Sequence, residues 1–299
     1  MGKSAMVIIN PSSGKEEAGE YEKEIRESLK EEYENVTVEH TSGGGDATKF
    51  AKRAGEEKVD LVVALGGDGT VNETVNGLAS FENPPVLGIV PMGTVNDLSK
   101  ALNIPGEPKK AIKLLISGKQ MEIDVGLANE RYFTNILGIG RAAKAIHDVD
   151  SEEKSNLGAL AYAIAIGKEA LKDDIFSVEI QTDTENWEGD VSVILIALID
   201  SLGGLKFILP DTEVGDGIFH IFAIKRLNVS QLMKMGSFLV LEDIKQSENV
   251  KYFKSKNVSI EALDGYNHGS DLDGEKGPEL PINLKIYSNH LTVISKDMD

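Results

Sequence analysis

The chain contains no cysteine in its 299 residues. Disulfide bonds, zinc–thiolate sites, iron–sulfur clusters and thiol nucleophiles are therefore excluded. Basic residues are also scarce, because 31 Lys and Arg stand against 49 Asp and Glu, a formal net charge of −18. Such a surplus of negative charge repels the phosphates of nucleic acid and disfavours broad adhesion to an anionic membrane. We therefore expect no nucleic-acid partner.

Long hydrophobic runs are missing as well. The longest, at 157–166 and 191–199, fall short of the roughly 20 residues that cross a bilayer. Residues 1–9 hold a single basic residue and no signal-peptide h-region. These features predict a cytoplasmic protein. With 41% hydrophobic and 27% charged residues the composition is globular, and the length predicts two domains.

The first 124 residues alternate strand and helix patterns. The run at 61–65 is apolar throughout, as expected for a strand buried on both faces. Expected strands lie at 5–10, 36–40, 61–65 and 86–90, and expected helices at 16–32, 46–56 with Asp46 as N-cap, 71–79, 95–101 and 108–117. This alternation predicts an open parallel sheet with helices on both sides.

Beyond about residue 124 the pattern becomes mainly β. Expected strands lie at 121–128, 132–136, 175–181, 189–199, 217–224, 250–261, 282–287 and 291–295, and expected helices at 157–171 and 230–243. Many strands with few helices favour an antiparallel sandwich. The predicted fold class is therefore α/β, with an N-terminal open parallel sheet and a C-terminal, mainly antiparallel β-sandwich.

A glycine-rich turn follows the most apolar expected strand. The turn consists of Gly66, Gly67, Asp68, Gly69 and Thr70 and leads into a helix. Backbone N–H groups in such a turn approach phosphate oxygens closely, and the helix dipole attracts anions. The carboxylate of Asp68 either holds N–H groups of the loop or faces a bound cation. Together these features predict a nucleotide site that uses Mg²⁺.

Two further polar loops follow strands of the same expected sheet. They span residues 10–15 and 91–97, and Thr41 ends a third strand. In an open α/β sheet, ligands bind beyond the carboxyl ends of the strands. We therefore expect these loops to converge on one site with the glycine-rich turn.

Several short motifs follow one another along the chain. They are Asn10-Pro11 with Ser13-Gly14, the glycine-rich turn with Asn72-Glu73, Gly93-Thr94 with Asn96-Asp97, Ile123-Asp124-Val125-Gly126, Pro210 with Asp216-Gly217, and Asp273-Gly274-Glu275. This ordered set resembles the catalytic domain of diacylglycerol kinases, above all the soluble bacterial lipid kinases. The resemblance implies a nucleotide-binding α/β domain over residues 1–124, to which residues 288–299 return. It implies a β-sandwich domain over residues 125–287.

The same resemblance implies transfer of the γ-phosphoryl group of ATP to a lipid hydroxyl, with diacylglycerol as the expected acceptor. The implied nucleotide-binding residues are Asn10, Pro11, Ser12, Ser13, Gly14, Thr41, Gly66, Gly67, Asp68, Gly69, Thr70, Asn72, Glu73, Gly93, Thr94 and Asn96. The implied structural Mg²⁺ site consists of Asp216, backbone carbonyls near Glu213 and Ile218, and a water link to Asp124.

Transfer to a hydroxyl needs a carboxylate that takes the proton. Asp273 or Glu275 is the expected base, and Asp68 and Asp97, with Asp124, are expected to organise the catalytic Mg²⁺ through waters. The expected partner is a lipid at the membrane surface, with peripheral, reversible contact, and base rates favour a homodimer. Two other hypotheses stay open: an NAD kinase-like enzyme on a soluble acceptor, and a nucleotide-binding regulatory protein without turnover.

Overall fold

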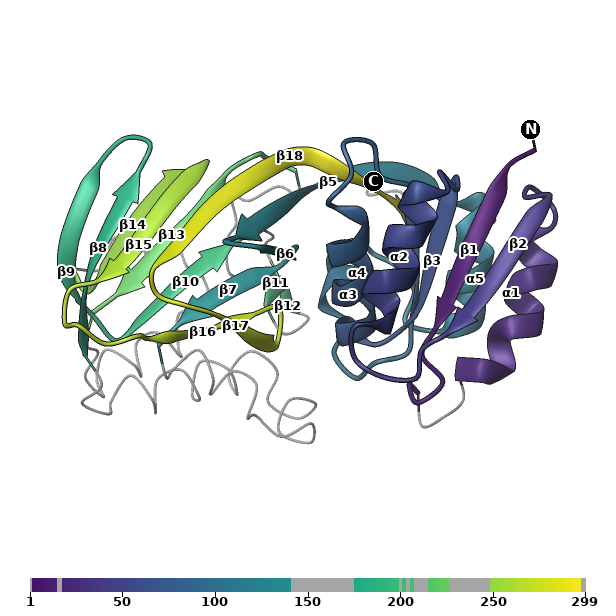
Figure 1. The fold of residues 1–299 in the computed structure, drawn as a ribbon, viewed down its shortest axis with the longest axis horizontal. Helices are drawn as coiled ribbons and strands as arrows, with labels where there is room; N and C mark the ends of the chain where they lie inside the picture. The colour runs from purple at the N-terminus through teal and green to yellow at the C-terminus, as the bar shows by residue number, and fades with distance from the viewer. Residues whose placement is uncertain are drawn as a thin grey trace. The chain divides into compact units, whose positions relative to one another are not determined.

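The computed structural model describes residues 2–14, 18–140, 175–198, 201–202, 205–206, 215–225 and 248–296. The chain divides into two compact units (Figure 1), Met1–Val125 with Asn289–Asp299, and Gly126–Ser288. The helices expected at 157–171 and 230–243 lie outside the described residues. Over the described part of the chain, no helix is long and apolar enough to cross a membrane.

The first unit is built on a parallel sheet with the strand order β2–β1–β3–β4. Its strands are β1 (Ser4–Ile9), β2 (Asn35–His40), β3 (Leu61–Gly66) and β4 (Val86–Pro91). The end of the last strand, β18 (Ile282–Ser295), extends this sheet, because Val293 pairs in parallel with Leu87 of β4. All six residues of β3 are buried, as the apolar run predicts.

Helices cover both faces of this sheet (Figure 1). They are α1 (Glu22–Leu29) after a short 3₁₀ turn η1 (Ala18–Tyr21), α2 (Asp46–Glu56), α3 (Asp68–Leu78), α4 (Asp97–Ala101) and α5 (Pro108–Ser117). The helices α2 and α3 pack against each other, and α1 packs against α5. The pair α2 and α3 covers one face of the sheet, and the pair α1 and α5 covers the other. Right-handed crossovers require these opposite faces, because the chain first runs from β1 to β2 and then reverses through β3 to β4.

The second unit contains two sheets. One has the order β18–β15–β8–β9, with the β5–β6 hairpin joined to β18, and the other has the order β14–β13–β10–β7–β16–β17. The strands are residues 126–128 of β5 (Lys119–Ala128), β6 (Arg131–Phe133), β7 (Ile136–Ile139), β8 (Phe176–Thr182), β9 (Asn186–Val191), β10 (Val193–Ala197), β13 (Phe219–Ile224), β14 (Val250–Ser255), β15 (Asn257–Ala262), β16 (Gly269–Leu272) and β17 (Glu275–Glu279). A separate two-stranded pair is formed by β11 (Ser201–Leu202) and β12 (Leu205–Lys206).

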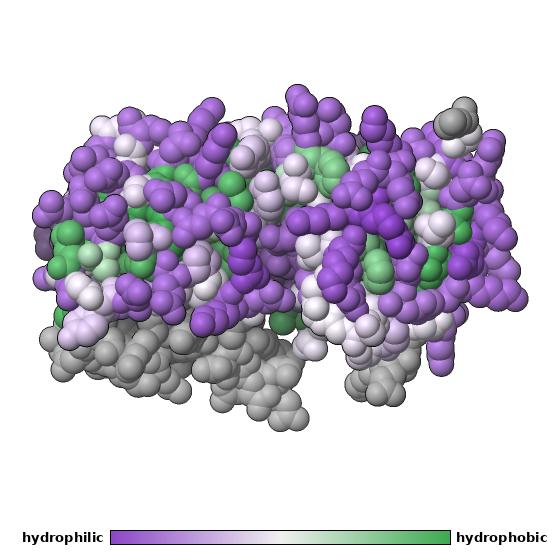
Figure 2. All heavy atoms as spheres, in the orientation of Figure 1, coloured by the Kyte–Doolittle hydropathy of each residue, from purple (hydrophilic) through white to green (hydrophobic). Residues whose placement is uncertain are grey.

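Burial in this unit follows the β period. Alternate residues of β8 are buried, and every residue of β10 and β13 is buried. The described surface is mostly hydrophilic on the face seen in Figure 2. Large hydrophobic side chains that are exposed in the described part of the chain are Ile175, Leu263 and Tyr266. The predicted fold class, a parallel α/β sheet followed by an antiparallel sandwich, is confirmed.

Three expected strands were wrong because each is two strands. The runs at 132–136, 189–199 and 250–261 divide into β6 and β7, β9 and β10, and β14 and β15. In each pair the first and second strands belong to different sheets. At the second corner Ser192 is buried and donates its N–H to the carbonyl of Ile224 (2.8 Å). The residue pattern of one strand continues into the next and so hides such a change of sheet, because both strands have side chains that face the same core.

Other boundaries also differ from the prediction. The strands expected at 282–287 and 291–295 are one strand, β18, and the hairpin β16–β17 was missed. Helix α3 begins at Asp68 rather than at residue 71, so three residues of the glycine-rich turn form its first turn.

Asp46 is not the N-cap of α2, as the sequence predicted. The cap is Gly45 in the left-handed conformation (φ 84°), and Asp46 is the first helical residue. Its carboxylate accepts the hydroxyl of Ser42 (2.7 Å) and the N–H groups of Ser42 and Gly43. The hydroxyl and N–H of Ser42 hold the pKa of Asp46 well below its usual value. The side chain therefore closes the loop before the helix instead of capping the helix.

Candidate active site

The loops of the first unit meet where the strand order reverses. In the order β2–β1–β3–β4 the reversal lies between β1 and β3, and α/β sheets bind ligands outside the strand ends at that point. Asn10, directly after β1, donates its backbone N–H to Leu65 of β3 (3.0 Å). Its side-chain amide donates to the hydroxyl of Thr70 on α3 (3.1 Å). The loops after β1 and β3 are therefore joined, as predicted.

The loop after β1 is closed by Asn10. Its side-chain oxygen accepts the N–H (3.1 Å) and the hydroxyl of Ser12, and its carbonyl accepts the N–H of Ser13 (3.1 Å). Gly14 has φ 63°, a conformation that favours glycine. Pro11 is half-buried in the same turn, and Thr41 follows β2 and donates its N–H to Ile9 (2.9 Å). The neighbouring strand ends thus lie at one edge.

The loop after β4 approaches the glycine-rich turn closely. A Cβ placed on Gly93 would lie 2.9 Å from the Cα of Gly67, so only glycine fits there. Thr94 is exposed in this loop, and Asn96 closes it by accepting the N–H of Gly93 (2.9 Å). The predicted contact between these two loops is therefore present.

Asp68 joins the same two loops through its side chain. One carboxylate oxygen accepts the N–H of Asn96 and the other accepts the N–H of Asp97, each at 2.8 Å. Of the two roles that the sequence left open for Asp68, holding N–H groups of a loop is the one seen here. Each oxygen keeps a lone pair that these bonds do not use.

We expect Asp68→Asn to weaken nucleotide binding and to destabilise the first unit. The amide would keep one N–H acceptor and place an NH₂ group against the other N–H. Loss of hydrogen bonds to a charged group costs about 1.5–3 kcal/mol each. Urea unfolding and titration with ATP would measure both effects. Exposed Glu82 offers the control Glu82→Gln, and equal behaviour of the two variants would contradict the prediction.

The loop at 42–45 also lies at this edge and was not predicted from the sequence. Glu73, expected as a nucleotide contact, accepts the N–H groups of Gly45 (2.7 Å) and Ala47 (3.1 Å) through its two carboxylate oxygens. Glu73 therefore caps α2 and ties the loop after β2 to α3. Buried Asn72 lies beside it on α3. Three consecutive glycines at 43–45, between a strand and a helix, were the available signal.

The second unit holds the expected catalytic carboxylates on the β16–β17 hairpin. Asp273 and Gly274 form its two-residue turn with φ 49° and 96°. The carboxylate of Asp273 accepts the N–H groups of Thr134 (2.8 Å), Asn135 (3.0 Å) and Ile136 (2.9 Å). Asp273 therefore ties the hairpin to the segment between β6 and β7.

Glu275 has a different environment from Asp273. One oxygen, Oε2, lies 3.0 Å from the guanidinium of Arg131, and the side chain is 40% exposed. Over the described residues its other oxygen, Oε1, accepts no hydrogen bond. Of the two expected bases, Glu275 has the accessible lone pairs.

The residues of the expected structural metal site are only partly described. Glu213 lies outside the described residues. Asp216 accepts the N–H of Ile218 (3.0 Å) through Oδ1, and its Oδ2 lies 2.9 Å from Nε2 of His220. Asp124 is buried in the other unit, where it accepts the N–H of Asn289 (2.8 Å). Groups of three or more metal-binding side chains do not occur among the described residues.

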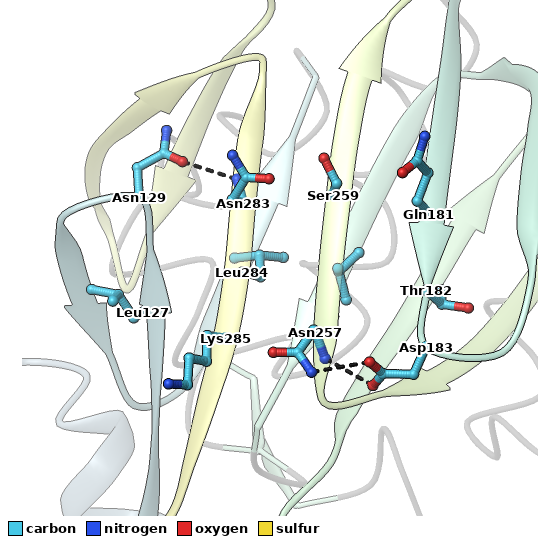
Figure 3. Close-up of a pocket in the computed structure, with 11 residues that line it drawn as sticks. Leu127, Asn129, Gln181, Thr182, Asp183, Asn257, Ser259, Asn283, Leu284 and Lys285 are labelled. Carbon is cyan, nitrogen blue, oxygen red and sulfur yellow. Dashed lines mark hydrogen bonds between the residues drawn. The ribbon is translucent and has the colours of Figure 1, made fainter.

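A concave face of the second unit lies over β5, β18, β15 and β8 (Figure 3) and encloses about 450 Å³. Its wall is formed by residues that include Asn129, Asn283, Ser259 and Gln181. The amide of Asn257 and neighbouring N–H groups lower the pKa of Asp183, at one end, to about 2. None of the predicted site residues lines this face.

Comparison with known proteins agrees with this fold. A family model of the diacylglycerol kinase catalytic domain matches residues 4–128, and one of the YegS C-terminal NAD kinase beta sandwich-like domain matches residues 135–295. The chain is 34% identical over 294 residues to a diacylglycerol kinase of Bacillus subtilis (strain 168), covering 98% of this chain and 96% of that one. It is 34% identical over 298 residues to a diacylglycerol kinase of Staphylococcus carnosus (strain TM300), covering 98% and 95%.

A solved structure is similar over nearly the whole chain. It is described as a diacylglycerol kinase from Bacillus anthracis str. Sterne, with a TM-score of 0.77, 26% identity, and coverage of 98% of this chain and 97% of that one. The fold and these comparisons together define an enzyme of the lipid kinase class. The chain belongs to the diacylglycerol kinase family, which confirms the family predicted from its motifs.

Proposed function

We propose that the enzyme transfers the γ-phosphoryl group of ATP to the free hydroxyl of diacylglycerol and forms phosphatidic acid. The observation that carries the proposal is the joining of the loops after β1, β3 and β4 at the point where the strand order reverses. The names of the relatives from Bacillus subtilis and Staphylococcus carnosus support diacylglycerol as the acceptor.

The nucleotide would bind at the N-terminus of α3. The helix begins at Asp68, and the N–H groups of Gly69 and Thr70 belong to its first turn. N–H groups at such a position, together with the helix dipole, bind phosphate. We propose the residues predicted for the nucleotide, Asn10–Gly14, Thr41, Gly66–Thr70, Asn72, Glu73, Gly93, Thr94 and Asn96, as the walls of this site.

Bound Mg²⁺ would neutralise the phosphate charge that develops during transfer. We propose that Asp68, Asp97 and Asp124 organise it through waters, and that Asp216, with carbonyls near Glu213 and Ile218, forms a structural site. The donor set fits a hard cation, since carboxylate and carbonyl oxygens are the ligands that Mg²⁺ prefers.

We propose Glu275 as the general base and Asp273 as the residue that holds the turn. The hydroxyl oxygen of the acceptor attacks the γ-phosphorus, the bond to the β,γ-bridging oxygen breaks, ADP leaves, and the proton passes to Glu275. The three backbone N–H groups and the hydroxyl of Thr134 (3.4 Å) support this division of roles, because two donors lie at each oxygen of Asp273. The half-exposed carboxylate of Glu275 has an oxygen available to a hydroxyl.

We also propose the cellular setting and the domain division. The enzyme would be cytoplasmic, would meet its lipid by peripheral and reversible contact, and would function as a homodimer. Residues 1–124 with 288–299, and residues 125–287, are proposed as its domains.

The test is phosphate transfer from γ-labelled ATP with Mg²⁺, with diacylglycerol in mixed micelles and NAD offered in parallel. We expect labelled phosphatidic acid and no label on NAD. Label on NAD alone would assign a soluble acceptor. Binding of ATP without transfer to either acceptor would favour a regulatory nucleotide-binding protein.

A further inference from the structure

Arg131 connects its own segment, residues 131–136, to residues 273–276, which include the proposed base Glu275. It is the first residue of β6, and its Nη2 lies 3.0 Å from Oε2 of Glu275. Its Nη1 donates to the backbone carbonyl of Lys276. The guanidinium therefore holds both the carboxylate of Glu275 and the chain just after it. Arg131 was not among the residues predicted for the site.

The backbone that carries Arg131 is itself anchored. Asn129, in the turn before β6, has φ 53° and accepts the N–H of Asn283 on β18 (2.9 Å) with its side-chain oxygen. Its own N–H donates to the carbonyl of Asn283 (2.9 Å). The side chain of Arg131 therefore starts from a defined position on the β5–β6 hairpin.

A second tie holds the same two segments a few residues away. Asp273 accepts the N–H groups of Thr134, Asn135 and Ile136, while Arg131 binds Glu275 and Lys276. Residues 131–136 and 273–276 are thus joined on both sides of Gly274. This double tie leaves the carboxylate of Glu275 little freedom, since both its backbone and one oxygen are held.

The contact contributes little to folding. The side chains of Arg131 and Glu275 are 37% and 40% exposed, and exposed ion pairs contribute about 0–1 kcal/mol. A planar guanidinium that binds two groups at once instead restricts their orientation. A general base must be held in the correct position relative to the proton that it takes, because misplacement of a reacting group by about 1 Å can lower the rate about 10²-fold.

We propose that Arg131 is a positioning residue for proton removal. It holds Oε2 of Glu275 and thereby directs Oε1 to the acceptor hydroxyl. This inference rests on the proposed function, in which Glu275 is the base. Because Arg131 acts through Glu275, its effect should disappear when Glu275 is already lost.

The test is a double-mutant cycle on phosphate transfer to diacylglycerol. We expect Arg131→Met to lower kcat by about 10- to 100-fold, with KM for ATP unchanged. Arg131→Lys should recover part of the loss. In the Glu275→Gln background, Arg131→Met should change kcat by less than about threefold. Arg26→Met is the matched control, since Arg26 also binds a glutamate (Glu22, 2.9 Å) and a carbonyl (Val36, 3.0 Å).

The results of the cycle separately test the role of Arg131, the role of Glu275 as base, and the proposed function. Equal losses of kcat from Arg131→Met in both backgrounds would show a structural role for Arg131 and overturn the inference. An unchanged kcat in Arg131→Met, together with a lowered kcat in Glu275→Gln, would also overturn it. Full turnover in Glu275→Gln would remove the base assignment of the proposed function instead. Absence of lipid phosphorylation by the wild-type protein would remove the proposed function itself.

Discussion

Glu275→Gln is expected to lower transfer to diacylglycerol by about 10²- to 10⁴-fold, the range that general base catalysis contributes. The amide keeps the shape of the side chain and cannot take the proton. ATP binding should be unchanged, because in the proposed function the nucleotide binds to the loops after β1, β3 and β4. Steady-state transfer of labelled phosphate and an ATP thermal-shift titration would measure the two quantities.

Glu279 provides the matched control for this prediction. It is an exposed glutamate on the same strand, β17. Glu279→Gln should transfer phosphate like the wild-type protein. If Glu275→Gln retains most of its turnover while Asp273→Asn loses it with ATP binding intact, the roles assigned to the two carboxylates are reversed.

Asp273→Ala is expected to destabilise the second unit by about 3–6 kcal/mol. The substitution removes the acceptor of three backbone N–H groups, and a buried donor left without a partner costs about 1–3 kcal/mol. It also places alanine at φ 49°, a conformation that asparagine and aspartate tolerate better. Urea unfolding followed by fluorescence reports on this unit, since the single tryptophan, Trp187, lies on β9.

Two further variants should lose less stability than Asp273→Ala. Asp273→Asn keeps an oxygen acceptor and the left-handed conformation, so it should lose roughly half as much stability. Asp271→Ala removes an acceptor of the N–H group of Gly274 (3.1 Å), a bond that is exposed to solvent, and should lose less than either. A loss below about 1 kcal/mol in Asp273→Ala would contradict a structural role for this carboxylate.

Local patterns predicted the first unit well. The helix expected at 108–117 is α5 with the same bounds, and the strand expected at 36–40 is β2 with one added residue. Both carry a signal within a few residues: a proline at the start of α5, and alternating side chains in β2. Patterns of this kind reflect contacts that recur every two to four residues, so a linear reading captures them.

The candidate site was predicted where motifs are contiguous and missed where partners are distant. The turn at 66–70 and the pair Asp273 and Glu275 could be selected from sequence, because glycine and carboxylate chemistry is local. Arg131 could not, since its partner Glu275 lies 144 positions away. Glu73 was selected as a nucleotide contact, while its bonds to the loop of α2 became visible only in the folded chain.

Periodicity and motif spacing are properties of neighbouring residues, and they were enough to predict the class of fold, the family and the glycine-rich turn. The corners where the chain changes sheet, the contacts between loops and the partners of each carboxylate depend on residues far apart in the sequence, so they were visible only in the folded chain. Asp68, Asp273 and Glu275 are chemically alike in the sequence. They differ in the folded chain because hydrogen-bond donors 28 to 144 positions away occupy the oxygens of each carboxylate to a different extent.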